Sequence, residues 1–178
     1  LYDCPPGTIF WDGTDIREFK IASLMERVAF VGQQAYLMGE SLRENLTYGA
    51  NREVPDEEII GMLEKLGLDR FVSTYRSRGD LLIGKQGVHL SGGEKQRLAL
   101  GRALLRNADL YILDEPLNAV DLGTEEVVME RIFSFLKGKT LLVVSHRQEA
   151  VASFDSVLRM EKKGIKKIFL NAEDPVPA

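Results

Sequence analysis

The stretch that most constrains the fold is 90–115, LSGGEKQRLALGRALLRNADLYILDE. A glycine-rich turn opens a helix there, and a short apolar strand that ends in two carboxylates follows the helix. Ser91 can cap the helix with its hydroxyl, and Glu94 completes a capping box. Gly92 and Gly93 leave backbone N–H groups bare at the positive end of the helix dipole, so this helix start can receive an anion. For these four residues alone, an ordinary capped helix start is the simpler interpretation.

The other end of this stretch indicates a site for a hard cation. Residues 110–113, LYIL, form a short unbroken apolar run, which is typical of a central parallel strand covered on both faces. The run places Asp114 and Glu115 at its carboxyl end, where open α/β sheets bind ligands. One carboxylate can hold hydrated Mg²⁺, and the other can polarise a water for attack on phosphorus. A polar turn after a strand is the alternative.

The two features lie one helix apart. In this order the stretch resembles three consecutive parts of an ATP-binding cassette (ABC) domain, namely the signature motif, the helix that links it to the sheet, and the Walker B strand. Further matches flank it in the order of that family. Gln33 in VAFVGQQ resembles the Q-loop, residues 118–121 (NAVD) the D-loop, and residues 145–147 (SHR) after LLVV the switch histidine. The segments QQAYLMGESLRENLTYG and GKQGVHLSGG are similar to the exporter branch, including its multidrug and drug-conjugate transporters.

The resemblance implies an α/β fold of the P-loop NTPase type, with a mostly parallel sheet flanked by helices, a small helical signature subdomain and a truncated N-terminal part. We expect residues 1–33 and 107–170 in the core sheet, 34–106 in the helical subdomain with the Q-loop and signature helix, and 171–178 in a tail. Local patterns predict helices at 21–27, from 41, at 55–66 and at 123–135, strands at 7–11, 28–31, 110–113 and 141–144, and a hairpin of 156–160 with 165–170.

The phosphate loop of this family, G-x-x-x-x-G-K-[ST], does not occur in the printed sequence. Residues 79–86 have its glycine and lysine spacing, but Gln86 stands where a hydroxyl should meet Mg²⁺. Residues 138–140, GKT, have Phe133 in place of the first glycine and lead into a strand. We therefore expect this Walker A part to belong to a longer domain, and the chain alone to hydrolyse no appreciable ATP.

By the same resemblance, the site residues take distinct roles toward ATP and Mg²⁺. Asp114 would hold the metal, and Glu115 would polarise the attacking water. His146 would donate to the γ-phosphate, while Gln33 would offer its side-chain oxygen to the metal or the water. The residues expected to meet the ATP of an opposite subunit are Ser91, Gly92, Gly93, Glu94 and Asp121. The simpler alternatives are a solvated loop amide for Gln33, a core histidine for His146 and a helix-start acid for Asp121.

A dimer follows from the spacing of these groups. The helix between Ser91 and the carboxylates spans roughly 20 Å, so we expect one nucleotide not to touch both within one subunit. The family resolves this with a head-to-tail pair of nucleotide-binding domains. It couples them to transmembrane domains, so the chain is expected at the cytoplasmic face of a membrane, with loop 34–40 toward the transmembrane partner.

Composition limits the remaining possibilities. The net charge of −4 argues against nucleic acid as a partner, and a single cysteine, Cys4, can form no internal disulfide. No apolar stretch approaches the length of a membrane span, so other segments or chains would do the spanning. We expect Lys95, Arg102 and Arg106 to form a solvated or salt-bridged basic edge of the signature helix. Two alternatives to the exporter stay open: a non-enzymatic regulatory or docking cassette, and a soluble ABC ATPase of DNA repair or translation.

Overall fold

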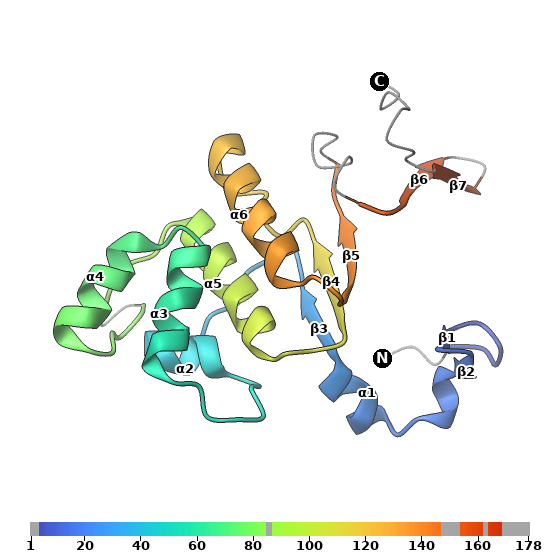
Figure 1. The fold of residues 1–178 in the computed structure, drawn as a ribbon, viewed down its shortest axis with the longest axis horizontal. Helices are drawn as coiled ribbons and strands as arrows, with labels where there is room; N and C mark the ends of the chain where they lie inside the picture. Colours follow the sequence, from blue (N-terminus) through green and yellow to red (C-terminus); the bar gives the residue numbers. More distant parts are fainter. Residues whose placement is uncertain (1–3, 85–86, 147–153, 162–163, 169–178) are drawn as a thin grey trace. The chain divides into compact units, whose positions relative to one another are not determined.

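Three parallel strands form the sheet that positions Gln33, Asp114 and Glu115. They are β3 (Val28–Val31), β4 (Leu110–Asp114) and β5 (Thr140–Val144), in that order (Figure 1). Val31 pairs with Leu113, and Asp114 pairs with Val144, so neighbouring strands end at nearly the same level. The strands predicted at 28–31, 110–113 and 141–144 are confirmed to within one residue.

The computed structural model describes residues 4–84, 87–146, 154–161 and 164–168. The chain divides into two units, 1–144 and 145–178. In the first unit the other elements are β1 (Phe10–Trp11), β2 (Thr14–Asp15), η1 (Ile16–Glu18), α1 (Ile21–Arg27), α2 (Leu42–Thr47), α3 (Asp56–Lys65), α4 (Asp69–Arg78), α5 (Gly92–Leu105) and α6 (Leu122–Phe135). The second unit contains the predicted hairpin as β6 (Val157–Glu161) and β7 (Gly164–Ile168). The last two residues predicted for that hairpin, 169–170, lie outside the described residues.

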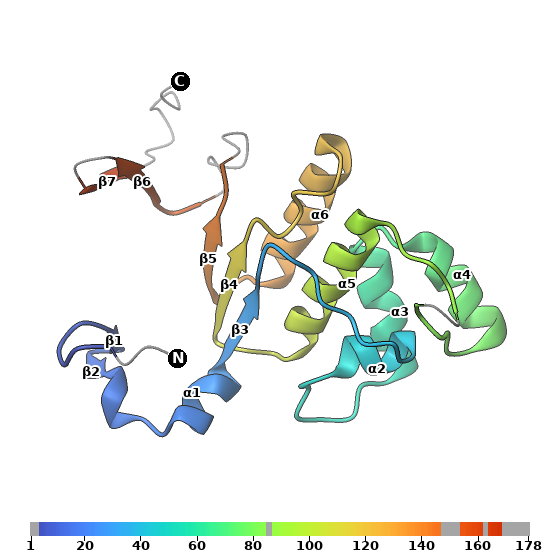
Figure 2. The same ribbon diagram turned by 180° about the vertical axis from the view of Figure 1, so that it is seen from behind.

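The two faces of the sheet differ in their cover. Tyr111 and Leu113 of β4 are buried in the hydrophobic core, on the face of the sheet that also buries Ala29 and Val31 of β3. On the opposite face Phe30 is 63% exposed and Leu142 47% exposed. In the view from behind, the three strands lie side by side to the left of α5 and α6 (Figure 2). We expected β4 to be covered on both faces, and this is wrong for the described residues, because Ile112 remains partly exposed.

The signature helix α5 packs closely against the helices of the predicted helical subdomain. Both predicted capping boxes are present, at Ser41 and at Ser91. Gly101 lies where α5 meets the apolar side chains of its neighbours. A Cβ there would lie 2.7 Å from Leu66 Cδ1 and 2.9 Å from Leu46 Cδ2. The backbone of α5 can approach this closely only because residue 101 has no side chain.

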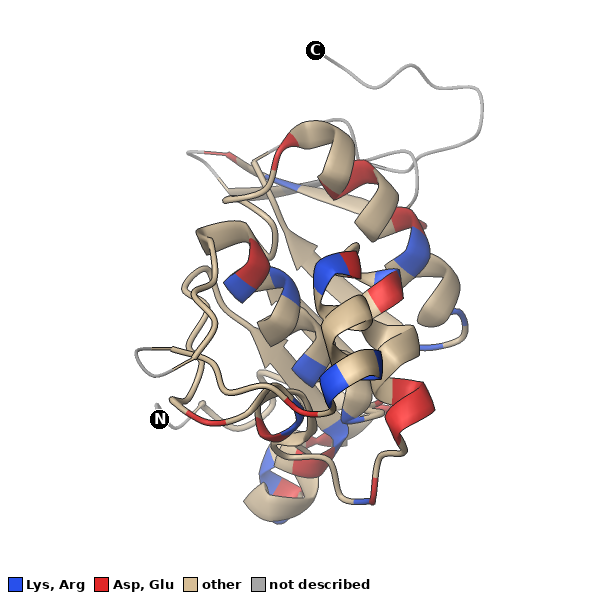
Figure 3. Cartoon of the chain, turned by 90° about the vertical axis from the view of Figure 1, so that its left-hand side faces the viewer, with Lys and Arg blue, Asp and Glu red and all other residues tan. Residues whose placement is uncertain are grey.

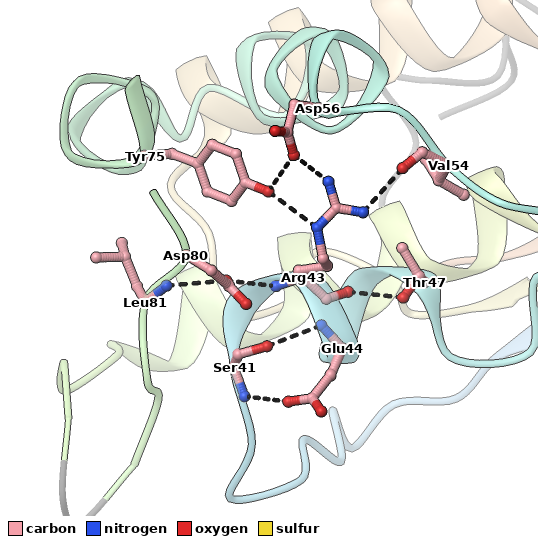
Figure 4. Close-up of polar contacts among 9 residues, drawn as sticks. All are labelled: Ser41, Arg43, Glu44, Thr47, Val54, Asp56, Tyr75, Asp80 and Leu81. Atoms are coloured by element: carbon pink, nitrogen blue, oxygen red, sulfur yellow. Dashed lines mark hydrogen bonds and ion pairs between the residues drawn. The ribbon is translucent and has the colours of Figure 1, made fainter. Parts of the chain in front are cut away.

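Arg43 joins three helices of this region (Figure 4). Its Nε donates to the Tyr75 hydroxyl at 3.2 Å, its Nη1 donates to Val54 O at 2.9 Å, and its Nη2 pairs with Asp56. The Tyr75 hydroxyl in turn donates to Asp56 Oδ1 at 2.7 Å. The hydrogen bond from Tyr75 and the bond from Arg43 lower the pKa of Asp56 from its ordinary value. The guanidinium therefore links α2 to α3 and α4.

The outer surfaces of α2, α3 and α4 carry charges of both signs (Figure 3). Arg76 pairs with Glu64 at 2.9 Å, and Arg52 pairs with Glu58. Such exposed pairs stabilise a fold little, and they agree with the solvated surface that the sequence predicts. Within the described part of the chain, no helix has both the length and the apolar character needed to cross a membrane.

Candidate functional site

Three predicted site residues follow neighbouring strands at the carboxyl edge of the sheet. Asp114 ends β4 and Glu115 follows it, while Gln33 comes two residues after β3. Glu115 N donates to Val144 O at 2.9 Å, so Glu115 leaves β4 still attached to the end of β5. Both carboxylates are half-buried, whereas Gln33 is exposed. This edge therefore presents two carboxylates and one side-chain amide at adjoining strand ends.

Glu115 has a strained backbone. Its φ is +50°, the left-handed region that residues with a Cβ adopt at a cost of roughly 1–2 kcal/mol. The following residue is Pro116, which has no N–H and cannot continue the strand ladder. Strain of this kind persists where the surrounding structure fixes it, often at functional sites. Here the ladder bond to Val144 and a bond from Asn118 N to Glu115 O, 3.4 Å long, hold the peptide.

The helix start at Ser91 is held by a carboxylate that is itself paired. Glu94 N donates to Ser91 Oγ at 3.2 Å, and Ser91 N donates to Glu94 Oε2 at 2.8 Å. Arg70 binds both oxygens of Glu94 at 2.6 Å. Burial by itself would raise the pKa of Glu94, but the Ser91 N–H and Arg70 outweigh it and lower this pKa from its ordinary value. The contact of residues 91–94 with the ATP of an opposite subunit stays a prediction.

The same helix start touches the turn after the carboxylates. A Cβ on Gly93 would lie 3.0 Å from Ala119 O and 3.2 Å from Val120 Cγ2. The turn after the carboxylates therefore contacts the helix start, while the separation of roughly 20 Å between Ser91 and the carboxylates stays a prediction. Asp121 ends this turn as the N-cap of α6, where its Oδ1 accepts from Thr124 N at 3.0 Å. That bond holds the pKa of Asp121 below its ordinary value.

Sequence reasoning missed Gln96, a buried amide of α5. Its Oε1 accepts from Ala119 N at 2.8 Å, and its Nε2 donates to Gln33 O at 3.2 Å and also to Asn118 Oδ1. A signal was present in the sequence: Gln96 lies four residues before Leu100, so it interrupts an apolar stripe of the helix. A polar residue in such a stripe indicates a buried hydrogen-bonding role.

The expected basic edge of α5 is wrong for two of its three members. Arg102 donates to Asn45 O at 2.7 Å, to Asn45 Oδ1 at 3.0 Å and to Tyr36 O at 3.0 Å. Arg106 donates to Met25 O at 2.7 Å. Burial lowers the pKa of Arg102 from its ordinary value. These guanidiniums bind main-chain oxygens of α1, α2 and the loop at Tyr36, which a helical periodicity cannot reveal, and of the three residues Lys95 alone is exposed.

The last predicted residues follow β5 in the chain. Ser145 and His146 come directly after Val144, are exposed, and belong to the second unit; Arg147 lies outside the described residues. The expected place of His146 beside the carboxylates stays a prediction. Within the described residues, no three His, Cys, Asp or Glu side chains gather as metal ligands. The donor set of Asp114, Glu115 and Gln33 fits Mg²⁺, which takes one or two carboxylates together with substrate phosphates and water.

A parallel sheet with polar residues at its carboxyl edge defines an α/β domain of the class that commonly has its ligand site at that edge. Comparison with known proteins specifies the class further. The family model described as "ABC transporter" matches residues 1–118. The chain belongs to the ABC transporter family.

Individual relatives point to exporters. The chain is 37% identical over 168 residues to the ATP-binding cassette sub-family B member 5 of Mus musculus, covering 94% of this chain and 13% of that protein. It is 34% identical over 161 residues to the ATP-dependent lipid A-core flippase of Idiomarina loihiensis, covering 90% of this chain and 28% of that protein. A solved structure, a bacterial Atm1-family ABC exporter with ATP bound, matches at a TM-score of 0.73 and 27% identity, over 83% of this chain and 26% of that one. The chain thus spans less than a third of each.

Proposed function

We propose that this chain forms the main part of an ATP-binding and ATP-hydrolysing domain of an ABC exporter. Two such domains, identical or different, would close head to tail on ATP and open after hydrolysis. This cycle would drive transmembrane domains that move a substrate across the membrane, with the chain at the cytoplasmic face. The observation that carries the proposal is the carboxyl edge of the sheet, where Gln33, Asp114 and a strained Glu115 lie at adjoining strand ends of this chain.

Each residue at this edge has a proposed task in phosphoryl transfer to water. Asp114 holds the cation, and Glu115 accepts the developing proton of the attacking water. Gln33 orients that water or the cation through its amide oxygen, and His146 donates to the γ-phosphate. Bound Mg²⁺ supplies charge neutralisation on the phosphates. The capped helix start at 91–94 and Asp121 face the ATP held by the opposite domain.

Replacement of Glu115 by Gln tests the enzymatic proposal. In the assembled transporter, Glu115→Gln should keep ATP binding and dimerisation but lower turnover by about a hundredfold or more, because the general base is lost. Equilibrium binding of a labelled ATP analogue and phosphate release measure the two properties. Glu126→Gln, an exposed carboxylate on α6, is the control. Undiminished turnover in Glu115→Gln would remove this residue from its role.

A groove beside the Q-loop is the proposed contact with the transmembrane domains. Its volume is about 310 Å³, and its lining includes Phe30, Tyr36, Tyr48, Arg102 and Arg106. Tyr36 is 79% exposed, and Tyr48 is 62% exposed. Aromatic and arginine side chains are the types enriched at protein interfaces. We expect Tyr36→Cys to form crosslinks to the transmembrane domains, and Glu53→Cys, an exposed residue outside the groove, to form none.

A non-enzymatic cassette is the second candidate. It is carried because neither glycine-lysine segment of the printed sequence, 79–86 or 138–140, matches a phosphate loop. A docking cassette would bind the transmembrane domains through the same groove but would bind no ATP in the assembled transporter. Photolabelling with an azido-ATP analogue separates the candidates, since labelling of this chain supports the ATPase and crosslinking without labelling supports the docking cassette.

A further inference from the structure

Gln96 is a buried side chain with polar partners from two different loops. It is 5% exposed. Its oxygen accepts from Ala119 N at 2.8 Å, and its Nε2 donates to Gln33 O at 3.2 Å and to Asn118 Oδ1. The two loops are 63 and 22 residues away from Gln96 in sequence. Loss of this amide would remove a hydrogen bond from each of three groups on these loops, and an intramolecular hydrogen bond contributes about 1 kcal/mol to stability.

These bonds extend to the ends of all three parallel strands. Gln33 follows β3, and Asn118 N donates to Glu115 O at the end of β4. Glu115 N donates to Val144 O at the end of β5. A continuous series of hydrogen bonds therefore runs along the carboxyl edge. Gln96 adds to the backbone ladder between β3 and β4 a side-chain link from the loop after β3 to the turn after β4.

The start of α5 contacts the same turn. Gly93, one helical turn before Gln96, packs against Ala119 O at 3.0 Å from an ideal Cβ position. A displacement of the helix start would therefore press on the turn 118–121, and Gln96 would carry the same displacement to the backbone of Gln33. Rigid packed elements with short contacts transmit such shifts.

We propose that Gln96 is a positioning residue that fixes Gln33 relative to the turn 118–121. It touches neither ATP nor the attacking water and acts through the residues it binds. The inference rests on the proposed function, in which Gln33 serves the cleft of its own domain and Asp121 faces the opposite one. Gln96 thereby holds the residues of the two clefts in a fixed arrangement, so that both clefts close together.

Nuclear magnetic resonance of the 178-residue chain tests the coupling without ATP. Asn118→Ala should shift the amide resonances of Gln33 and Gln34 in the parent chain. The shift should be lost in a Gln96→Met background, which keeps the side-chain length but removes its hydrogen bonds. Lys95→Met, an exposed change one residue earlier on α5, should preserve the shift.

An equal shift in both backgrounds, or none in the parent chain, would overturn the proposal. If Gln96→Met does not fold, Gln96→Glu, which keeps an acceptor for Ala119 N and loses the donor, replaces it.

Turnover in the assembled transporter tests the consequence. Gln96→Met should lower kcat about tenfold while the KM for ATP changes less than about twofold, because positioning is lost and the nucleotide contacts remain. A merely structural role would lower the amount of folded protein and leave kcat per folded molecule unchanged, and that result would overturn the inference. A parent transporter without ATPase activity would instead refute the proposed function, and the resonance shifts would still decide the coupling.

Discussion

At the scale of single residues, Glu115 combines the proposed chemistry with backbone strain, and the two can be separated. Its φ of +50° disfavours any side chain but costs glycine little. Glu115→Gly should therefore be more stable than Glu115→Gln by about 1 kcal/mol, since both variants lose the charge and only one loses the Cβ. Urea unfolding of the two variants measures the difference. Equal stabilities would show that the left-handed conformation is not strained.

The sequence could predict residues whose role depends on strand ends and caps. Gln33, Asp114 and Glu115 follow apolar runs, and Ser91 precedes a helix by a local rule, so each location was evident before the fold was known. Gln96 and Arg102 were different. Their partners lie on loops distant in the chain, such as Asn118 and Tyr36, and only the packing of α5 against those loops reveals them.

At the scale of elements, two glycines in helices test what close packing costs. Gly101→Ala in α5 would place a Cβ 2.7 Å from Leu66 Cδ1, whereas Gly61→Ala in α3 would meet only Lys65 Nζ at 4.0 Å. Both changes gain up to about 1 kcal/mol of helix propensity, but overpacking costs about 1–3 kcal/mol. We expect Gly101→Ala to destabilise the fold by about 1 kcal/mol and Gly61→Ala to stabilise it. Thermal unfolding followed by circular dichroism checks both, and a stabilising Gly101→Ala would contradict the packing described.

The cluster of Arg43, Tyr75 and Asp56 makes the packing of α2, α3 and α4 sensitive to acid. The pKa of Asp56 is lowered from 3.8 by its bonds from Tyr75 and Arg43. Its contribution to stability is therefore present above pH 3.8 and is lost as the pH falls through the lower folded-state pKa. Asp56→Asn should lower the Tm at about pH 7 and should lower it less at about pH 3. Glu57→Gln, in the same turn of α3, is the matched control; an equal loss of Tm at both pH values would contradict this role of Asp56.

The elements themselves were largely predictable because their signals are local. The helix at 21–27 and the strand at 28–31 match α1 and β3 at both ends. Capping boxes, apolar periodicity and glycines with positive φ act within a few residues, so these signals can be recognised without knowledge of the tertiary structure. The short strand β2 (Thr14–Asp15) was missed, since two residues carry no periodicity. The division of 34–106 from the core sheet stays a prediction.

At the scale of the whole molecule, the fold class followed from the sequence while the cover of the sheet did not. The resemblance of the motifs to an ABC domain implied a mostly parallel α/β sheet, and the family assignment agrees. An apolar run such as residues 110–113 is compatible with cover on two faces, yet the run itself does not supply the covering element. The open face is therefore a property that only the packed structure displays.

That open face should make the chain associate through apolar contact. Phe30, Leu142 and Val144 are 63%, 47% and 50% exposed, and parallel sheets are normally covered on both faces. We expect the 178-residue chain to bind an apolar dye and to self-associate with rising concentration. Leu142→Lys should lower dye binding by roughly a third, because it removes one of three exposed side chains and introduces a charge.

Leu82→Lys, at a residue 56% exposed outside the sheet, is the matched control for Leu142→Lys. Fluorescence titration and sedimentation velocity measure the two effects, and equal dye binding by both variants would mean that the apolar surface lies elsewhere.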